Sequence, residues 1–225
     1  MTGSGDSAKK SPLWPKPDYS QCAFADDFPQ KVSYAVGFWT AQGPTVCGGL
    51  GGEDKCFLYE KYQWKTWTNM ETERRYASAL QINSSHTLII GGKDENEKRL
   101  QTTELISSSG SKEGNTFPVT ISAHCSFHIN ATHGMVTAGV QNGKNSSATW
   151  YVNMTSTTFV RGPPMTTRRV AHGCSIVQLG SKSYGVVSGG YYDRKLLDST
   201  EMINLDQESP TWIDGMQDKS KIVYF

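Results

Sequence analysis

The sequence predicts an all-β protein made of about four repeated units. A pair of small residues follows a short apolar segment at four places, which are Gly48-Gly49, Gly91-Gly92, Ala138-Gly139 and Gly189-Gly190. The first positions of these pairs are separated by 43, 47 and 51 residues. The segments before the pairs are rich in β-branched residues, as strands are. A period in this range, with a strand before each pair, is typical of stacked β-sheet units and favours a propeller.

Regular structure is expected to begin near Lys31. Residues 1–30 contain several prolines, which break regular elements, so they are predicted to form a largely irregular tail. In the segment 31–41, Val32, Tyr34 and Val36 occupy every second position. This alternation is typical of a half-buried strand and marks the first strand of the first unit.

Each unit is then expected to contain an alternating strand, a short apolar strand ending at the glycine pair, a polar loop, and two further strands. The units are placed at about 31–72, 73–120, 121–167 and 168–217, and residues 218–225 are interpreted as the start of a truncated further unit. Glycine allows a backbone turn with positive φ and a close approach of neighbouring elements. The glycines expected to have this structural role are Gly48, Gly49, Gly91, Gly92, Gly139, Gly189 and Gly190.

Two cysteines flank the first glycine pair. Cys47 ends the strand before the pair, and Cys56 opens the next apolar segment. If the two segments form an antiparallel hairpin, these residues face each other within reach of a disulfide, which would persist in an oxidising compartment. Cys125 and Cys174 are expected to be buried thiols or a bridge between units, and Cys22 has no evident partner.

Two further observations bear on the location of the protein. Asn-X-Ser/Thr sequons occur four times, where roughly two are expected by chance, and favour a secreted glycoprotein. The glycosylation candidates are Asn83, Asn130, Asn145 and Asn153. Against this, the first 17 residues lack the apolar core of a signal peptide. We expect an extracellular or secretory-pathway protein, with a cytoplasmic location as the alternative.

Charge and hydropathy argue against two classes of partner. The 22 Lys and Arg residues nearly balance the 21 Asp and Glu residues, so no field that would attract nucleic acid is implied. No apolar segment approaches the roughly 18 residues that a membrane-spanning helix needs. We therefore expect neither a nucleic-acid partner nor a membrane span.

Several repeated fragments resemble those of kelch-repeat proteins. They include Val46-Cys47-Gly48-Gly49 with Cys56, and Val187-Ser188-Gly189-Gly190 with Thr200-Glu201 and Trp212. Residues 31–217 look most like extracellular invertebrate kelch-like proteins. The resemblance implies a propeller of four-stranded blades that binds other proteins through its loops. Kelch rings usually contain about six blades, so four units predict an incomplete ring or an atypical closure.

Catalytic chemistry is weakly indicated. His124 and His172 lie near neighbouring cysteines at equivalent points of consecutive units, which favours a structural role over a zinc site. No Gly-X-Ser-X-Gly, phosphate-binding loop or His-Glu-X-X-His motif occurs. Because galactose oxidase shows that a kelch-type propeller can host copper, a copper oxidase-like enzyme stays as a minor alternative. We expect no enzyme, no cofactor and no metal site.

Two arginine pairs, Arg74-Arg75 and Arg168-Arg169, lie at unit junctions and have two interpretations. They could contact a partner, since arginine is favoured at interface hot spots. They could instead lie in solvated turns or pair with a nearby acid such as Glu71 or Glu73.

The function that the sequence favours is a non-catalytic protein-binding kelch scaffold with an unknown protein partner. An intracellular kelch adaptor, such as a ubiquitin-ligase substrate receptor, is the principal alternative. That alternative predicts reduced cysteines and unmodified sequons.

Overall fold

The computed structural model describes residues 27–215. Residues 1–26 of the predicted tail, Cys22 among them, and the predicted further unit at 218–225 lie outside the described residues. The described part of the chain is all-β, as predicted, and contains no helix. In residues 27–215 there is accordingly no helix that could cross a membrane.

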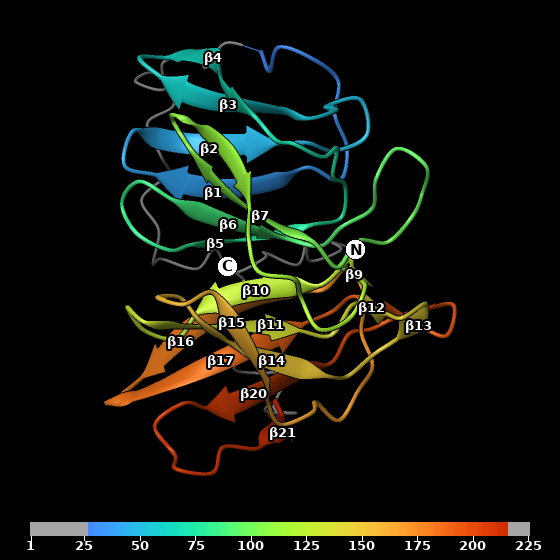
Figure 1. The fold of residues 1–225 in the computed structure, drawn as a ribbon. Coiled ribbons are helices and arrows are strands. Elements are labelled where there is room, and N and C mark those ends of the chain that lie inside the picture. The colour runs from blue at the N-terminus through green and yellow to red at the C-terminus, as the bar shows by residue number, and fades with distance from the viewer. Residues whose placement is uncertain (1–26, 216–225) are drawn as a thin grey trace, which may run out of the picture.

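Four antiparallel four-stranded sheets follow one another along the chain (Figure 1). Sheet 1 contains β1 (Val36–Thr40), β2 (Gly43–Cys47), β3 (Lys55–Glu60) and β4 (Gln63–Asn69). Sheet 2 contains β5 (Ser78–Gln81), β6 (Thr87–Ile90), β7 (Thr103–Ser107) and β8 (Gly110–Glu113). Sheet 3 contains β10 (Cys125–His128), β11 (His133–Thr137), β14 (Thr149–Asn153) and β15 (Thr158–Arg161). Sheet 4 contains β16 (Gly173–Leu179), β17 (Lys182–Ser188), β20 (Thr200–Asn204) and β21 (Trp212–Asp214).

Five short strands form two accessory sheets. One contains β9 (Ile121–Ser122), β12 (Val140–Gln141) and β13 (Lys144–Asn145), with β12 in the middle. The other pairs β18 (Tyr191–Tyr192) with β19 (Lys195–Leu196). The hairpins β12–β13 and β18–β19 lie in the loops that connect the second and third strands of sheets 3 and 4, whereas β9 lies in the segment that enters sheet 3.

The strands of each large sheet pair in the order in which they occur in the chain. Because side chains alternate between the two sides of a strand, each sheet has one face toward the preceding sheet and one toward the following sheet. In sheet 4, for example, Val187, Ile203 and Trp212 pack against sheet 3. We call the face toward the preceding sheet the upstream face, and the face toward the following sheet the downstream face.

The four sheets form a row in which the first strands β1, β5, β10 and β16 lie side by side. Main-chain hydrogen bonds join these strands at one residue just before each of them, and we call this series the inner ladder. Its bonds run from Tyr76 N–H to Tyr34 C=O, from Ala123 N–H to Tyr76 C=O and from Ala171 N–H to Ala123 C=O, at 3.0, 2.9 and 2.9 Å. Figure 1 shows sheets 1 and 4 at opposite ends, so residues 27–215 form no closed ring.

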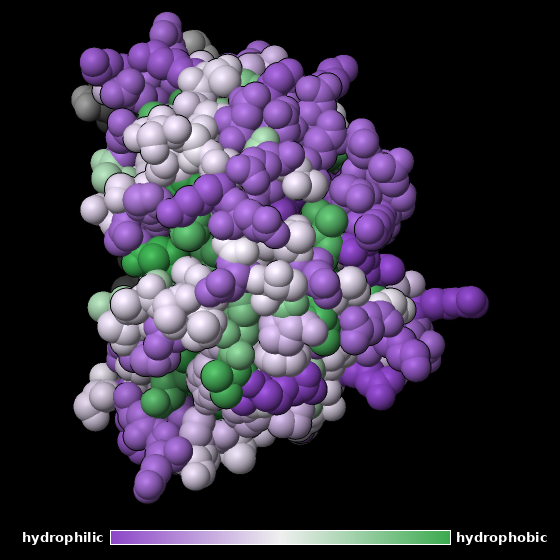
Figure 2. All heavy atoms as spheres, viewed as in Figure 1, coloured by the Kyte–Doolittle hydropathy of each residue, from purple (hydrophilic) through white to green (hydrophobic). Residues whose placement is uncertain are grey.

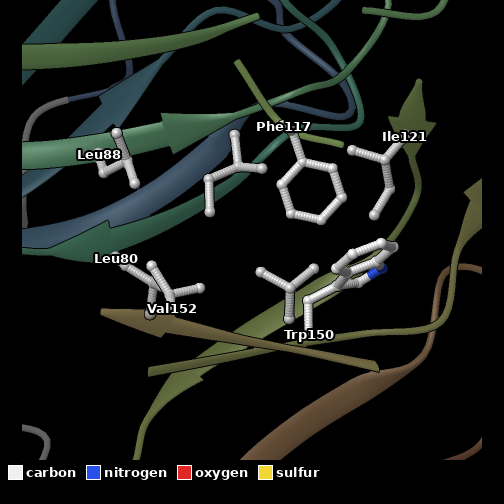
Figure 3. Close-up of a cluster of buried hydrophobic side chains, with 8 residues drawn as sticks. Leu80, Leu88, Phe117, Ile121, Trp150 and Val152 are labelled. Atoms are coloured by element: carbon white, nitrogen blue, oxygen red, sulfur yellow. The ribbon is translucent and has the colours of Figure 1, made fainter. Parts of the chain in front are cut away.

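The hydrophobic core lies in the joints between consecutive sheets. In the joint of sheets 2 and 3, Leu80 and Leu88 face Trp150 and Val152, and Phe117 from the connecting segment fills the space between them (Figure 3). Similar clusters occupy the joints of sheets 1 and 2 and of sheets 3 and 4. Each fully buried aliphatic or aromatic side chain contributes about 2 to 3 kcal/mol, so the joints hold the row together.

Candidate functional site

The candidate site is the edge of the row at which the second strand of each sheet ends in its glycine pair. The loops to the third strands and the segments that enter each sheet meet there. We call this edge the glycine-pair face. The opposite edge carries the turns between first and second strands, and we call it the hairpin edge. Loops on a rigid sheet framework are where binding residues are usually found, so the glycine-pair face is described from its main chain outward.

The glycine pairs join each sheet to the next through the main chain. The N–H of the second residue of a pair donates to a carbonyl in the segment entering the following sheet. The three bonds run from Gly49 to Arg74, from Gly92 to Ile121 and from Gly139 to Arg169, each at 2.8 Å. At Gly92, φ is +98°, and an added Cβ would lie 2.8 Å from the Arg75 carbonyl oxygen. Only glycine fits so close a contact in this conformation.

A buried arginine supports the glycine pair of sheet 2. The guanidinium of Arg74 donates from Nε to the Glu104 carboxylate at 2.8 Å, and from one terminal nitrogen to the carbonyls of Gly91 and Thr102, both at 2.9 Å. Its other terminal nitrogen donates to the Thr102 hydroxyl and to Glu104. All five N–H groups therefore have partners, as burial of this charge requires.

The carboxylate of Glu104 is equally well satisfied. It accepts from the N–H groups of Glu71 and Thr72 at 2.7 and 3.1 Å, and from the Ser111 hydroxyl at 2.7 Å. The ion pair thus connects the segment entering sheet 2 to its third strand β7. The predicted alternative of a bridge from Arg74 to Glu71 is wrong, because Glu71 contributes only its main-chain N–H.

Arg169 repeats this arrangement in sheet 4. It donates to the carbonyls of Gly189 and Ser199 at 2.9 and 2.8 Å, and to the Glu201 carboxylate. Burial alone would raise the pKa of Glu201, but hydrogen bonds from Thr166 and its neighbour and from Arg169 hold that pKa below its ordinary value. Glu201 is therefore ionised at neutral pH. Neither buried arginine is accessible to a partner.

Sheet 3 supports its glycine pair without an ion pair. Trp150 occupies the place in β14 that Glu104 has in β7, and the glycine pair begins with Ala138 at a φ of +51°. Here the side-chain amide of Gln141 donates to the carbonyls of Ala138 and Ala148 at 2.9 and 3.3 Å. The indole N–H of Trp150 in turn donates to the Gln141 oxygen at 3.3 Å. This Gln–Trp pair replaces the Arg–Glu pair, which accounts for the missing acid in this unit.

The accessible part of the face between sheets 1 and 2 contains a depression of about 160 Å³. It is bordered by glycine-pair residues and by a group of acidic and basic side chains. Its accessible charged lining residues are Glu53, Glu73, Arg75, Lys93, Asp94 and Glu95, and the buried Arg74 also borders it. Desolvation and the neighbouring charges of Glu95, Glu53 and Asp54 raise the pKa of Glu73.

Next to this depression lie aromatic and charged side chains that the core does not use. Tyr34 stacks on Tyr76 with ring centroids 4.1 Å apart, and the Lys93 ammonium lies 5.6 Å from the Tyr76 ring centroid. Arg75 and Lys93 both pair with the exposed Glu97. Glu97 is exposed, whereas the side chains of Arg75 and Lys93 are 13% and 22% exposed, so a partner would reach only the outer part of these two groups. Figure 2 shows one side of the molecule as largely hydrophilic, with hydrophobic residues in patches that include the boundaries between sheets.

The two histidines that the sequence singled out are buried between sheets. The His172 ring nitrogen Nε2 lies 2.8 Å from the Thr137 hydroxyl, whereas neither ring nitrogen of His124 has a partner among the described residues. Burial, followed by the charge of His172, lowers the pKa of His124 to about 3. Burial, followed by the charge of Arg169, lowers the pKa of His172 to about 4. Both rings are therefore neutral at pH 7 and belong to the packing of sheets 3 and 4.

The four cysteines in residues 27–215 form two disulfides. Cys47 and Cys56 pair across β2 and β3, with Cα atoms 4.0 Å apart. Cys125 and Cys174 join β10 to β16, with Cα atoms 6.0 Å apart, and so connect sheets 3 and 4 covalently. Two disulfides are a weak indication of an oxidising, extracellular environment.

Two of the four sequons occupy equivalent turns on the hairpin edge. Asn83 Oδ1 accepts from the N–H groups of Ser85 and His86, and Asn130 Oδ1 accepts in the same way from Thr132 and His133. Both asparagines are exposed. The other two candidates, Asn145 at the end of β13 and Asn153 at the end of β14, are half-buried.

Between residues 27 and 215, no group of three or more His, Cys, Asp or Glu side chains is arranged to hold a metal ion. No protein-family model matches the chain, and no curated protein matches it. The glycine-pair face thus consists of a framework of main-chain hydrogen bonds and an accessible surface of charged and aromatic side chains.

The first prediction concerns the buried guanidinium. Replacing Arg169 by Met leaves the Glu201 carboxylate buried and unpaired, so Arg169→Met should lower the free energy of unfolding by about 3 to 5 kcal/mol. The adjacent Arg168 is exposed and supplies the matched control. Urea unfolding followed by tryptophan fluorescence measures both, and Arg168→Met should change the value by less than about 0.5 kcal/mol. Equal effects of the two substitutions would contradict this assignment.

The second prediction concerns acid stability. The folded-state pKa of His172 lies below the unfolded value, so the unfolded chain binds the proton first and stability falls as the pH drops from about 6.5 to about 4. At pH 4 the loss from this residue is roughly 3 kcal/mol. Unfolding of the wild type and of His172→Gln, measured across this window, should show a flatter profile for the variant. Parallel profiles would contradict the assignment.

Proposed function

We propose that the chain is a non-catalytic protein-binding scaffold of the kelch type, in which four propeller blades form an open arc. The repeated main-chain bonds between sheets carry this proposal, because one geometric step is used at every joint. In a propeller such a step places the corresponding loops of all blades on one face. The loops of the glycine-pair face would then act together as a single binding surface.

The chemistry of that surface favours a protein as the partner. Arg75, Lys93 and Glu97 offer mixed charge, and Tyr34 and Tyr76 offer aromatic area with hydroxyl groups. Tyrosine and arginine are enriched at protein interface hot spots, whereas the balanced charge does not favour a polyanion. The copper oxidase-like alternative lacks a supporting ligand cluster in residues 27–215, and metal analysis of the purified protein tests it.

An extracellular or secretory-pathway location forms part of the proposal. It is supported by the disulfides Cys47–Cys56 and Cys125–Cys174 and by exposed sequons on the hairpin edge. A glycan on that edge would leave the glycine-pair face uncovered. The intracellular kelch adaptor remains the alternative, because its loops would use the same face.

The third prediction tests the binding face. The double variant Arg75→Glu/Lys93→Glu reverses two charges on the glycine-pair face, and the control Lys61→Glu/Lys182→Glu reverses two exposed charges on the hairpin edge. With each immobilised, proteins recovered from extracellular fluid of the source organism are quantified by mass spectrometry. At least one protein should be recovered with both the wild type and the control. The amount of this protein recovered with the face variant should be at least tenfold lower. Circular dichroism checks that all three are folded, and recovery that does not differ between the two variants argues against this face.

The fourth prediction tests the location. Produced through a eukaryotic secretory pathway, the chain should show two disulfides in its non-reduced intact mass and glycans that a glycosidase removes. Asn83→Gln and Asn130→Gln should each remove one glycan, because these two asparagines are exposed. Free thiols at Cys47 and Cys56, together with unmodified asparagines, would favour the intracellular adaptor.

A further inference from the structure

The two ends of the row are complementary in their main-chain groups. The inner ladder begins at Tyr34 and ends at Ala171. Among the described residues, the N–H of Tyr34 and the C=O of Ala171 make no hydrogen bond. The sheet 1 end therefore presents the N–H donor of an inner-ladder bond, and the sheet 4 end presents the C=O acceptor. Every interior joint contains such a bond. Tyr34 is 53% exposed, which leaves its end of the ladder open to solvent.

The glycine-pair bonds show the same complementarity. In the interior joints, the acceptor carbonyl lies two residues before the ladder residue of the following sheet. For sheet 1 that position is Val32, and for sheet 4 the corresponding donor is the N–H of Gly190. Neither group has a hydrogen-bond partner in residues 27–215. A copy of sheet 1 placed after sheet 4 would therefore satisfy both bonds at once.

The side chains at the two ends also match the interior joints in kind. On the downstream face of sheet 4, Val186, Met202 and Ile213 are cross-strand neighbours, and Ile213 is 56% exposed. On the upstream face of sheet 1, Trp39 is 65% exposed and Val46 is half-buried, whereas the neighbouring Phe57 is covered by Phe28 of the segment before the sheet. By contrast, the apolar side chains that line the interior joints are almost completely buried. The sheet 4 end and the β1–β2 part of the sheet 1 end thus resemble the two halves of a joint.

We propose that the downstream face of sheet 4 binds the upstream face of sheet 1 of a second copy of this chain. A second copy is the occupant because each end lacks the group that the other end supplies. Such a contact is heterologous, and two copies close into a ring if each row spans half a turn, whereas another curvature gives a longer assembly. The proposal depends on the end sheets, and it shares only Tyr34 with the proposed binding surface. A monomer would overturn it and leave the proposed function standing.

The oligomeric state is the first test. Light scattering coupled to size-exclusion chromatography, over a wide concentration range, should show a dimer or larger assembly of the wild-type chain. Trp39→Glu and Ile213→Glu each place a charge on one end at an already exposed position, so the fold should persist. Each should weaken the association at least tenfold. Tyr62→Glu, at a position 67% exposed in the turn after β3, is the control and should associate like the wild type.

Mixing the two charge variants distinguishes a heterologous contact from a self-complementary one. Trp39→Glu retains an intact sheet 4 end, and Ile213→Glu retains an intact sheet 1 end. At a concentration at which each variant alone is monomeric, an equimolar mixture should therefore form a one-to-one dimer with a single contact. Association of Trp39→Glu alone, a mixture that stays monomeric, or a wild type that is monomeric at every concentration would each refute the proposal.

The disulfide between sheets 3 and 4 supplies a test of register. Cys125 lies two residues after its ladder residue, and Cys174 lies three residues after the next one. The matching positions at the proposed contact are Gly173 and Gly37, and an added Cβ at either would meet no atom closer than 4.0 Å.

In a Cys22→Ser background, Gly37→Cys and Gly173→Cys proteins should give a disulfide-linked heterodimer when mixed under oxidising conditions. Ser175→Cys in place of Gly173→Cys is shifted by two residues along the same face and is the matched control. It should give at least tenfold less covalent product on a non-reducing gel. Equal yields from the two pairs would overturn the register.

Discussion

The arrangement of the sheets depends on one repeated main-chain hydrogen bond, from the second glycine of each of the first three pairs to the segment entering the next sheet. The bond forms only if the two backbones approach so closely that no Cβ can stand between them, as at Gly92. It fixes the edge of one sheet against the start of the next. The hydrophobic side chains of the joint then meet in register, and the inner ladder continues. Apolar burial supplies most of the energy, and this bond supplies the geometry.

The side chains that support the glycine pairs stabilise this close contact with different chemical groups. Turning the chain at the first residue of the pair leaves carbonyl oxygens inside the protein, where an unpaired group is costly. Arg74 and Arg169 satisfy them with a guanidinium whose charge a glutamate balances, and Gln141 satisfies them with a neutral amide. What the three units share is therefore a pair of buried donors. This explains how Trp150 can stand where two other sheets have a glutamate.

The period of the glycine pairs predicted the all-β fold and the repeated sheets, because a tight contact and a positive φ require glycine, which is recognised directly in the sequence. The Arg–Glu pairs were less visible. Arg74 and Glu104 are 30 residues apart, and nearer acids such as Glu71 competed as partners. The half-buried Cys125 and Cys174 gave no local hairpin signal, since they join different sheets. Whether the units form a kelch propeller, and what its loops bind, are still proposals, because fold and loop chemistry alone do not specify a partner.

The linear arrangement of the sheets determines the order in which the joints between them open. In residues 27–215 the main contacts between large sheets join neighbours in sequence, so cooperativity is nearly one-dimensional, as in repeat proteins. The disulfide Cys125–Cys174 makes the last two sheets one covalent block, whereas sheets 1 and 2 are joined by packing and hydrogen bonds alone. Opening should therefore be directional, with amide protons of the joint between sheets 1 and 2 exchanging with solvent before those between sheets 3 and 4. Reduction of that one disulfide would remove the difference.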